Sequence, residues 1–240
     1  MRLDIFLHTE KGLKSRSYAV SLIKNGAIKV NGSIVTKPAF EIFDGDEIEI
    51  TQEQKYVSRG GEKLEKALEA FQIDVSGMTA LDIGASTGGF TDCLLQHGAK
   101  KVFAVDVGTD QLDPKLRNDA RVVSLEKTHI KDLAESAVEP PDIIVIDVSF
   151  ISLRKVVPHL RRFCKENTTV IALFKPQFET GIPHKGVIHD EKLRARLLSE
   201  FIEFLPTEGF SAIGQTVSPI KGGDGNVEFL LHIKYTETKE

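Results

Sequence analysis

Few cysteines and no long apolar run occur in this chain, and both shortages exclude whole classes of protein. Only Cys93 and Cys164 are present among 240 residues, and neither belongs to a Cys-x-x-Cys pair or a cluster with histidine. We therefore expect no disulfide framework and no metal site. No stretch approaches the roughly 18 apolar residues of a membrane span, and the N-terminus lacks the apolar core of a secretory signal. We expect a globular protein of the cytoplasm, with no membrane partner.

Residues 79–91, Thr-Ala-Leu-Asp-Ile-Gly-Ala-Ser-Thr-Gly-Gly-Phe-Thr, form the most informative segment. A short apolar run breaks into a glycine turn, a helical pattern follows, and Asp106 closes the next apolar run. This order is typical of a nucleoside pocket in an open α/β sheet. Because glycine has no Cβ, the turn lets the backbone approach a ligand closely. Asp106 could accept hydrogen bonds from a ribose.

The turn lacks the marks of two other nucleotide sites. Gly84 is followed by glycine only at Gly88 and Gly89, which does not fit the G-x-G-x-x-G of dinucleotide-binding proteins, and there is no P-loop lysine. Asp82, just before the turn, suits a positively charged ligand better than a pyrophosphate. We therefore favour S-adenosylmethionine, which carries sulfonium and amino groups. An NAD site and a tight turn without a ligand remain the alternatives.

Charge is uneven along the chain, although the net charge is only −4. Residues 1–38 carry seven lysines and arginines against two acids, and five acids follow within residues 41–49. This permits a basic face on a small domain. The patterns in this part predict a short apolar helix at residues 3–7, a second helix that Ser15 or Ser17 caps and Gly26 ends, and strands at 28–30, 34–35 and 47–50, the first two joined by Asn31-Gly32.

This layout resembles the S-four-like RNA-binding module of a small-subunit ribosomal protein. The matching residues are Leu3-Asp4, Lys14-Ser15-Arg16, Val30-Asn31-Gly32, Lys37-Pro38 and Asp44-Gly45-Asp46. The resemblance implies a phosphate-binding face with salt-dependent affinity and little sequence readout. The alternative is an ordinary solvated face. The predicted RNA-binding residues are Lys14, Arg16, Lys24, Lys29, Lys37 and, beyond the connector, Arg59.

The remainder alternates strand and helix patterns, which predicts a mostly parallel sheet with helices on both faces. We expect strands at 80–84, 102–106, 122–125, 143–147, 170–175, 210–217 and 227–235. We expect helices at 62–71, 153–164 and 190–205, and one that follows the glycine turn and ends at Gly98. Because no helix separates the last two strands, the last should be antiparallel, as in the Rossmann-like sheet of methyltransferases. The predicted domains are residues 1–50 and 59–240, with a linker at 51–58.

Four charged residues stand where apolar ones are expected. Lys63 lies at the margin of the apolar face of its helix, and Asp147 and Lys175 close two very apolar strands. Glu228 stands in an apolar strand after a glycine loop. Ligands of doubly wound sheets bind outside the carboxyl ends of the strands, so these side chains should converge on a substrate. Snorkelling of Lys63 to water and a purely structural salt bridge are the alternatives.

These four residues resemble the lysine, aspartate, lysine, glutamate tetrad of FtsJ-like ribose 2′-O-methyltransferases. They lie in the segments Ser58-Arg59-Gly60-Gly61-Glu62-Lys63-Leu64, Asp147-Val148-Ser149-Phe150-Ile151-Ser152-Leu153, Lys175-Pro176-Gln177-Phe178-Glu179 and Gly225-Asn226-Val227-Glu228. With the N-terminal module, the chain is similar over essentially its whole length to the TlyA family of ribosomal RNA cytidine 2′-O-methyltransferases, often labelled haemolysins. That family's connector commonly carries an arginine and a tryptophan where this chain has Gln54-Lys55-Tyr56-Val57. This difference leaves open whether both subunit RNAs or only the large one are substrates.

The resemblance implies methyl transfer from S-adenosylmethionine to a ribose 2′-hydroxyl, with ribosomal RNA or ribosomal subunits as the partner. A ribose hydroxyl is a poor nucleophile, so it needs a base or a field that favours the alkoxide. We expect Lys175 to act as general base or alkoxide stabiliser, Asp147 to orient it, and Lys63 and Glu228 to position the ribose. The predicted cofactor residues are Asp82, Gly84, Ser86, Gly88, Gly89 and Phe90 near the methionine end, Asp106 at the ribose, and His129 and Ile130 near the adenine.

Other functions fit the sequence less well. Asp147-Val148-Ser149-Phe150 lacks the paired prolines of many enzymes that methylate base nitrogens, and neither cysteine lies at a strand end. A membrane-active haemolysin is one alternative, although no segment outside the sheet pattern supplies an amphipathic element. A non-catalytic RNA-binding assembly factor is the other. The target nucleotide and the oligomeric state are not encoded in a recognisable pattern.

Overall fold

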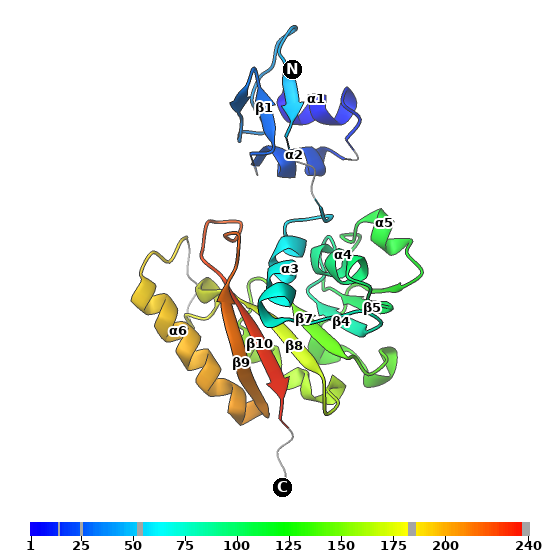
Figure 1. Cartoon of the computed structure of the whole chain (residues 1–240), viewed down its shortest axis with the longest axis vertical. Coiled ribbons are helices and arrows are strands. Elements are labelled where there is room, and N and C mark those ends of the chain that lie inside the picture. The colour runs from blue at the N-terminus through cyan, green and yellow to red at the C-terminus, as the bar shows by residue number, and fades with distance from the viewer. Residues whose placement is uncertain (14, 25, 52–54, 182–185, 237–240) are drawn as a thin grey trace. The chain divides into compact units, whose positions relative to one another are not determined.

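The computed structural model describes residues 1–13, 15–24, 26–51, 55–181 and 186–236. The chain forms two compact units, Met1–Ser58 and Arg59–Glu240 (Figure 1). The first unit contains α1 (Leu3–Thr9), α2 (Arg16–Lys24), β1 (Ile28–Val30), β2 (Ser33–Ile34) and β3 (Ile48–Ile50).

In the first unit, two helices pack beside an antiparallel sheet of order β2-β1-β3. Asn31 and Gly32 both have positive φ angles, +50° and +77°, and Val30 pairs with Ser33, so the predicted two-residue hairpin forms. The Ser15 hydroxyl accepts from the Tyr18 N–H at 3.1 Å and caps α2. The other candidate cap, the Ser17 side chain, lies outside the described part.

The second unit is built around a seven-stranded sheet of order β6-β5-β4-β7-β8-β10-β9. Its strands are β4 (Thr79–Ile83), β5 (Lys101–Val105), β6 (Val122–Leu125), β7 (Ile143–Ile146), β8 (Thr169–Phe174), β9 (Phe210–Val217) and β10 (Phe229–Tyr235). β10 runs antiparallel to both neighbours, and the pairs from β6 to β8 are parallel. The predicted sheet, with its antiparallel last strand, is confirmed.

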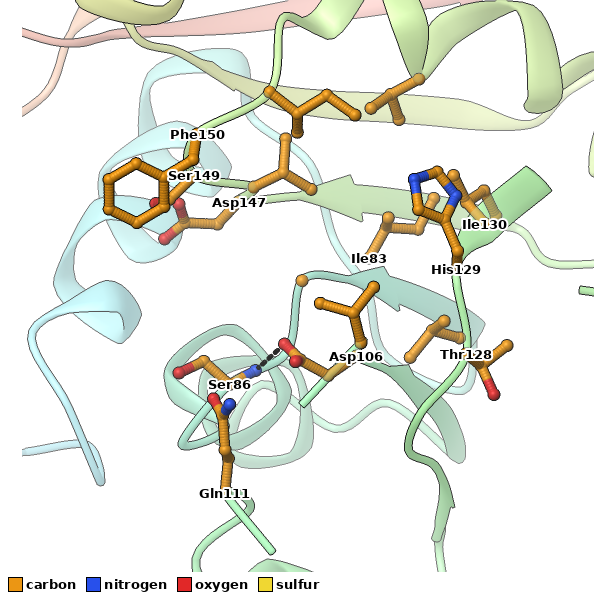
Figure 2. Close-up of a pocket in the computed structure, with 16 residues that line it drawn as sticks. Ile83, Ser86, Asp106, Gln111, Thr128, His129, Ile130, Asp147, Ser149 and Phe150 are labelled. Carbon is orange, nitrogen blue, oxygen red and sulfur yellow. Dashed lines mark hydrogen bonds between the residues drawn. The ribbon is translucent and has the colours of Figure 1, made fainter. Parts of the chain in front are cut away.

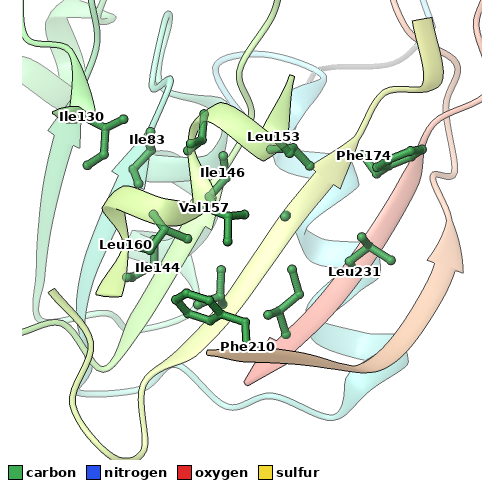
Figure 3. Close-up of a cluster of buried hydrophobic side chains, with 14 of the residues drawn as sticks. Ile83, Ile130, Ile144, Ile146, Leu153, Val157, Leu160, Phe174, Phe210 and Leu231 are labelled. Atoms are coloured by element: carbon green, nitrogen blue, oxygen red, sulfur yellow. The ribbon is translucent and has the colours of Figure 1, made fainter. Parts of the chain in front are cut away.

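The helices of this unit are α3 (Gly60–Phe71), α4 (Gly89–Gln96), α5 (Pro114–Arg117) and α6 (Glu191–Phe204). On one face of the sheet, a large apolar cluster joins β4, β5, β7, β8 and β10 to α6 and to short 3₁₀ turns (Figure 3). On the other face, α3 and α4 pack together, and Phe71 of α3 lies 5.3 Å from His232 of β10 between ring centroids. Both faces are therefore covered, as a mostly parallel sheet requires.

Two predicted elements differ from the structure. The helix expected at 153–164 is a series of 3₁₀ turns, η3 (Leu153–Lys155), η4 (Val157–His159) and η5 (Arg161–Phe163). Pro158, in the middle, lacks the N–H that an α-helix needs there. Glu228 lies one residue before β10 rather than inside it, although its carbonyl still accepts from the Ser218 N–H at 2.9 Å.

Candidate active site

The glycine turn between β4 and α4 begins at Gly84, which has a φ of +85°. A Cβ at this position would collide with the main chain of Asp147, which follows β7. Gly84 therefore lets the ends of two neighbouring parallel strands approach each other, as well as lining a pocket. The strand order reverses between β4 and β7, which is where open α/β sheets bind ligands.

Asp106, directly after β5, fixes this turn. One carboxylate oxygen accepts from the Ser86 N–H at 2.8 Å (Figure 2). The other accepts from the Gly108 N–H at 2.7 Å. An ionised carboxylate has about four lone-pair positions. Asp106 can therefore accept further hydrogen bonds from a vicinal pair of ligand hydroxyls.

A pocket of about 400 Å³ opens beside Asp106. In Figure 2, Asp147, Ser149 and Phe150 lie at one end, and Thr128, His129 and Ile130 lie at the other. The lining residues are Ile83, Gly84, Ser86, Val105, Asp106, Val107, Gln111, Thr128, His129, Ile130, Asp147, Val148, Ser149, Phe150, Ile151 and Val156. The volume lies in the range of sites for small molecules and cofactors.

Five of the predicted cofactor residues line this pocket: Gly84, Ser86, Asp106, His129 and Ile130. Asp82, Gly88, Gly89 and Phe90 are not among the lining residues. Phe90 is 3% exposed and belongs to the core, while Gly88 faces Leu112 and Leu116. The sequence pattern predicted the whole turn, but of its predicted residues only Gly84 and Ser86 line the pocket.

Asp82 is fully buried behind the turn. Its Oδ2 accepts from the Thr91 hydroxyl at 2.6 Å, and its Oδ1 has no hydrogen-bond partner among the described residues. Burial, with smaller contributions from the charges of Asp147 and Asp106, raises the pKa of Asp82 to about 7, against the lowering effect of hydrogen bonds from Thr91. A buried carboxyl with an unused acceptor and a strongly raised pKa marks this end of the sheet as a candidate functional site.

The four predicted catalytic residues form two ion pairs. Lys63 Nζ lies 2.5 Å from Glu228 Oε2, and Lys175 Nζ lies 2.6 Å from Asp147 Oδ1. Lys175 also donates to the Ser149 hydroxyl at 2.8 Å. Lys63, Lys175 and Glu228 are at most 8% exposed.

Strand pairing brings the two ion pairs together. Phe229 of β10 pairs with Phe174 of β8, and the ladder between β9 and β10 continues to Glu228. The antiparallel register therefore sets Glu228 opposite Lys175, the residue after Phe174. The two ion pairs are therefore neighbours at the carboxyl ends of β7 and β8.

Side-chain alternation explains why these residues share a face. The large apolar cluster takes every second residue of the strands, including Ile83, Val105, Ile146, Phe174 and Phe229. The next residue points to the opposite face, where α3 and α4 lie. Asp106, Asp147 and Lys175 each follow such a residue, and Glu228 precedes one. Lys63 belongs to α3, which packs on this second face, and it pairs there with Glu228.

Phe150 and Gln111 line the pocket, and the site predictions contained neither. Phe150 is 90% exposed, has a φ of +64°, and its ring lies 5.3 Å from that of Phe178 between centroids. An exposed phenylalanine in the left-handed region is unusual and indicates a functional position. Its place three residues after the strand-end Asp147 was the available signal.

The predicted RNA-binding residues differ in how free their charges are. Lys24 and Lys37 are exposed, whereas Lys29 lies 3.6 Å from Glu49. Arg16 donates to the buried Asp4 at 2.8 Å, so part of its guanidinium is structural. Arg59 is half-buried at the start of α3, and Lys14 lies outside the described residues.

Asp4 shows how the small unit manages a buried carboxylate. Burial alone would raise the pKa of Asp4, but hydrogen bonds from Arg2 and Arg16 outweigh burial and lower it. Arg2 donates at 2.9 Å from the other side. This cluster ties α1 to the start of α2.

Comparisons with known proteins agree with this geometry. Residues 56–235 match the FtsJ-like methyltransferase family, and residues 1–48 match the S4 domain. Hemolysin A of Brachyspira hyodysenteriae is 49% identical over 97% of this chain and 99% of its own. The 16S/23S rRNA (cytidine-2′-O)-methyltransferase TlyA of Mycobacterium tuberculosis is 41% identical over 97% of this chain and 89% of its own.

A solved structure of a hemolysin-labelled protein from Streptococcus thermophilus superposes with a TM-score of 0.79 at 41% identity, covering 99% of this chain and 89% of that one. Among the described helices, none has both the length and the apolar character needed to cross a bilayer. The resemblance found in the sequence is confirmed: the chain belongs to the FtsJ-like methyltransferase family.

Proposed function

We propose that this protein transfers a methyl group from S-adenosylmethionine to a ribose 2′-hydroxyl of ribosomal RNA, with a cytidine as the target nucleoside. The observation that carries the proposal is the pair of buried ion pairs, Lys63 with Glu228 and Lys175 with Asp147, beside a nucleoside-sized pocket. The name of the relative TlyA, an rRNA cytidine-2′-O-methyltransferase, supports this choice of substrate.

The pocket fits S-adenosylmethionine on two observations. Asp106 follows the strand next to the switch point and keeps acceptor capacity for ribose hydroxyls, and the buried Asp82 has an Oδ1 without a partner among the described residues. We assign the ribose end to Asp106, the adenine end to His129 and Ile130, and the methionine end to the turn at Gly84 and Ser86. When bound, the cofactor supplies an electrophilic methyl group.

Lys175 is the group that we assign to the substrate hydroxyl. A lysine ammonium has three N–H donors, and the described contacts to Asp147 and Ser149 use two of them. The third can stabilise the negative charge that develops on a 2′-oxygen as it attacks, in a site shielded from water. Asp147 holds the amine in place, and Lys63 with Glu228 forms the neighbouring wall that positions the ribose.

Phe150 gives the site a surface for a base. Its ring is exposed at the pocket mouth and is supported by Phe178. Single-stranded nucleotides bind by stacking unpaired bases on aromatic side chains. We therefore assign to Phe150 the stacking of a nucleobase whose ribose lies near Lys175.

The N-terminal unit is proposed to bind RNA. It matches the S4 domain, and its lysines at 24 and 37 are exposed. Phosphate contacts of this kind add affinity that depends on salt and little on sequence.

The test is methylation of purified ribosomal subunits with labelled S-adenosylmethionine, followed by mapping of 2′-O-methyl groups. Wild-type protein should label RNA at a ribose, and Lys175→Ala should not. Lys66→Ala controls for the loss of a lysine elsewhere in this unit, because Lys66 is exposed on α3 and is not among the residues that line the pocket. Label on a base, label in Lys175→Ala, or RNA binding without affinity for the cofactor would reject the proposal.

A further inference from the structure

Two loops meet at the carboxyl ends of β7 and β8, where the ion pair of Lys175 and Asp147 lies. One follows β7 and carries Asp147, Ser149 and Phe150, and the other follows β8 and carries Lys175 and Phe178. The ion pair, the Lys175–Ser149 hydrogen bond and the Phe150–Phe178 ring contact all join one loop to the other. Their geometry therefore depends on what holds the loops together.

Glu179, four residues after Lys175 in the second loop, reaches back to the first. Its Oε2 accepts from the Ser152 hydroxyl at 2.5 Å, and its Oε1 accepts from the Leu153 N–H at 2.7 Å. Ser152 also caps the turn η3 by accepting from the Arg154 N–H at 3.1 Å. Leu153 is 2% exposed within the large apolar cluster, so the point to which Glu179 is attached is rigid.

Burying the Glu179 carboxylate costs the folded state desolvation free energy. Burial raises the pKa of Glu179 despite the bonds from Ser152 and Leu153 and the charge of Arg154, so the carboxylate is only partly compensated for its loss of water. An apolar contact would join two loops with less penalty. A carboxylate with two fixed acceptor oxygens does what an apolar contact cannot, because it fixes direction as well as distance.

We propose that Glu179 is a positioning residue for methyl transfer. By holding the loop of Asp147 and Phe150 against the loop of Lys175 and Phe178, it sets the alignment of the catalytic amine and the base platform. This inference rests on the proposed function. It assigns to Glu179 no contact with substrate or cofactor, since Glu179 is not among the residues that line the pocket.

The first test compares single-turnover methylation in three variants. Glu179→Ala should slow methyl transfer about 10- to 100-fold while changing the affinity for S-adenosylhomocysteine by less than about twofold, because a misplacement of about 1 Å can cost a hundredfold. Glu179→Gln should recover most of the rate, because the amide oxygen can accept from Leu153 and the amide nitrogen can donate to Ser152.

Asp142→Ala is the matched control. Asp142 likewise accepts from a backbone N–H, that of Thr79 at 2.8 Å, and from a side chain, that of Lys165 at 2.6 Å, but it precedes β7 at the opposite edge of the sheet. Its loss should lower the melting temperature without slowing methyl transfer. An equal slowing in Asp142→Ala, or none in Glu179→Ala, would overturn the proposal.

A second test does not depend on activity. The chain contains no tryptophan, so Phe150→Trp introduces a single fluorescent reporter into the first loop. In this background, Glu179→Ala should lower the fluorescence anisotropy, whereas Glu179→Gln and Asp142→Ala should not. Unchanged anisotropy in Glu179→Ala would contradict the positioning role even if the protein methylated another substrate. If the wild-type protein did not methylate RNA but Glu179→Ala still lowered the anisotropy of the Phe150→Trp protein, only the proposed function would be rejected.

Discussion

The two units of the molecule treat charged side chains in opposite ways. In the N-terminal unit, Lys24 and Lys37 are exposed, and the buried Asp4 is satisfied by Arg2 and Arg16 so that its pKa falls. In the C-terminal unit, Lys63 and Glu228 are buried as a pair, and the pKa of the buried Asp82 rises to about 7.

The exposed charges of the N-terminal unit suit binding of RNA, and the buried charges of the C-terminal unit suit catalysis. Exposed cations cost little to maintain and act on phosphates at a distance, but salt weakens them. Buried charges cost several kcal/mol of desolvation each, and they persist where a fixed electrostatic environment is needed. The first arrangement suits capture of RNA, and the second suits activation of one oxygen atom.

The largest effect is expected at Lys175. Lys175→Ala should lower the single-turnover rate of methyl transfer at least about a thousandfold, or about 4 kcal/mol of transition-state stabilisation, because it removes the donor to the developing oxyanion.

Lys175→Arg sharpens this test, because arginine keeps the charge and cannot act as a base. Partial activity with an unaltered pH profile would assign electrostatic stabilisation, and complete inactivity would favour proton transfer. A rate near wild type in Lys175→Ala would contradict both roles.

Variants of the Lys63–Glu228 pair should show separate effects on stability and on activity. Lys63→Ala leaves Glu228 buried without its partner and should lower the free energy of unfolding by about 3–5 kcal/mol, measured by denaturant titration.

Replacing both residues, by Lys63→Met with Glu228→Leu, should restore stability to within about 1 kcal/mol of wild type, since two apolar groups replace two charges. The double variant should remain inactive. If it regained methyl transfer, the pair would be structural only.

Asp82 should make stability depend on pH. Its pKa rises from 3.8 to about 7 on folding, so between these values the folded state holds a proton that the unfolded state has lost. Stability from this group is therefore present at low pH and is lost as pH rises toward 7, by about 2–3 kcal/mol between pH 5 and 8.

Asp82→Asn has no proton to lose and should remove this part of the slope. Unfolding of both proteins in urea at pH 5 and pH 8 measures the difference. Equal slopes would show that Asp82 is ionised throughout.

Local patterns were sufficient to predict most of the fold. Alternation of apolar strands with helices predicts the sheet, and the missing helix before the last strand predicts its antiparallel direction. The predicted helix at 153–164 was wrong because Pro158 interrupts an otherwise apolar pattern.

The site could be predicted only in part. Charges that end apolar strands stand out in the sequence, which is why Asp147 and Lys175 were marked. Their pairing depends on register: Glu228 comes opposite Lys175 because Phe229 pairs with Phe174. Whether a residue of this segment faces the pocket, as Ser86 of the turn does, or the core, as Phe90 of α4 does, depends on the packing of α4. Phe150 belongs to no recognisable sequence motif apart from the segment that begins at Asp147.

The smallest effect should come from the exposed lysines, and it should have a different character. Replacing Lys24 and Lys37 with alanine should weaken RNA binding about three- to tenfold at low salt and reduce the salt dependence of the affinity, because two phosphate contacts and their counterions are lost. The single-turnover rate at saturating RNA should not change, since neither side chain belongs to the unit that carries Lys175. Filter binding at several salt concentrations, beside methylation at saturating substrate, measures both. A fall in the saturated rate would mean that the N-terminal unit shapes the RNA for catalysis, and the division between capture and chemistry would then fail.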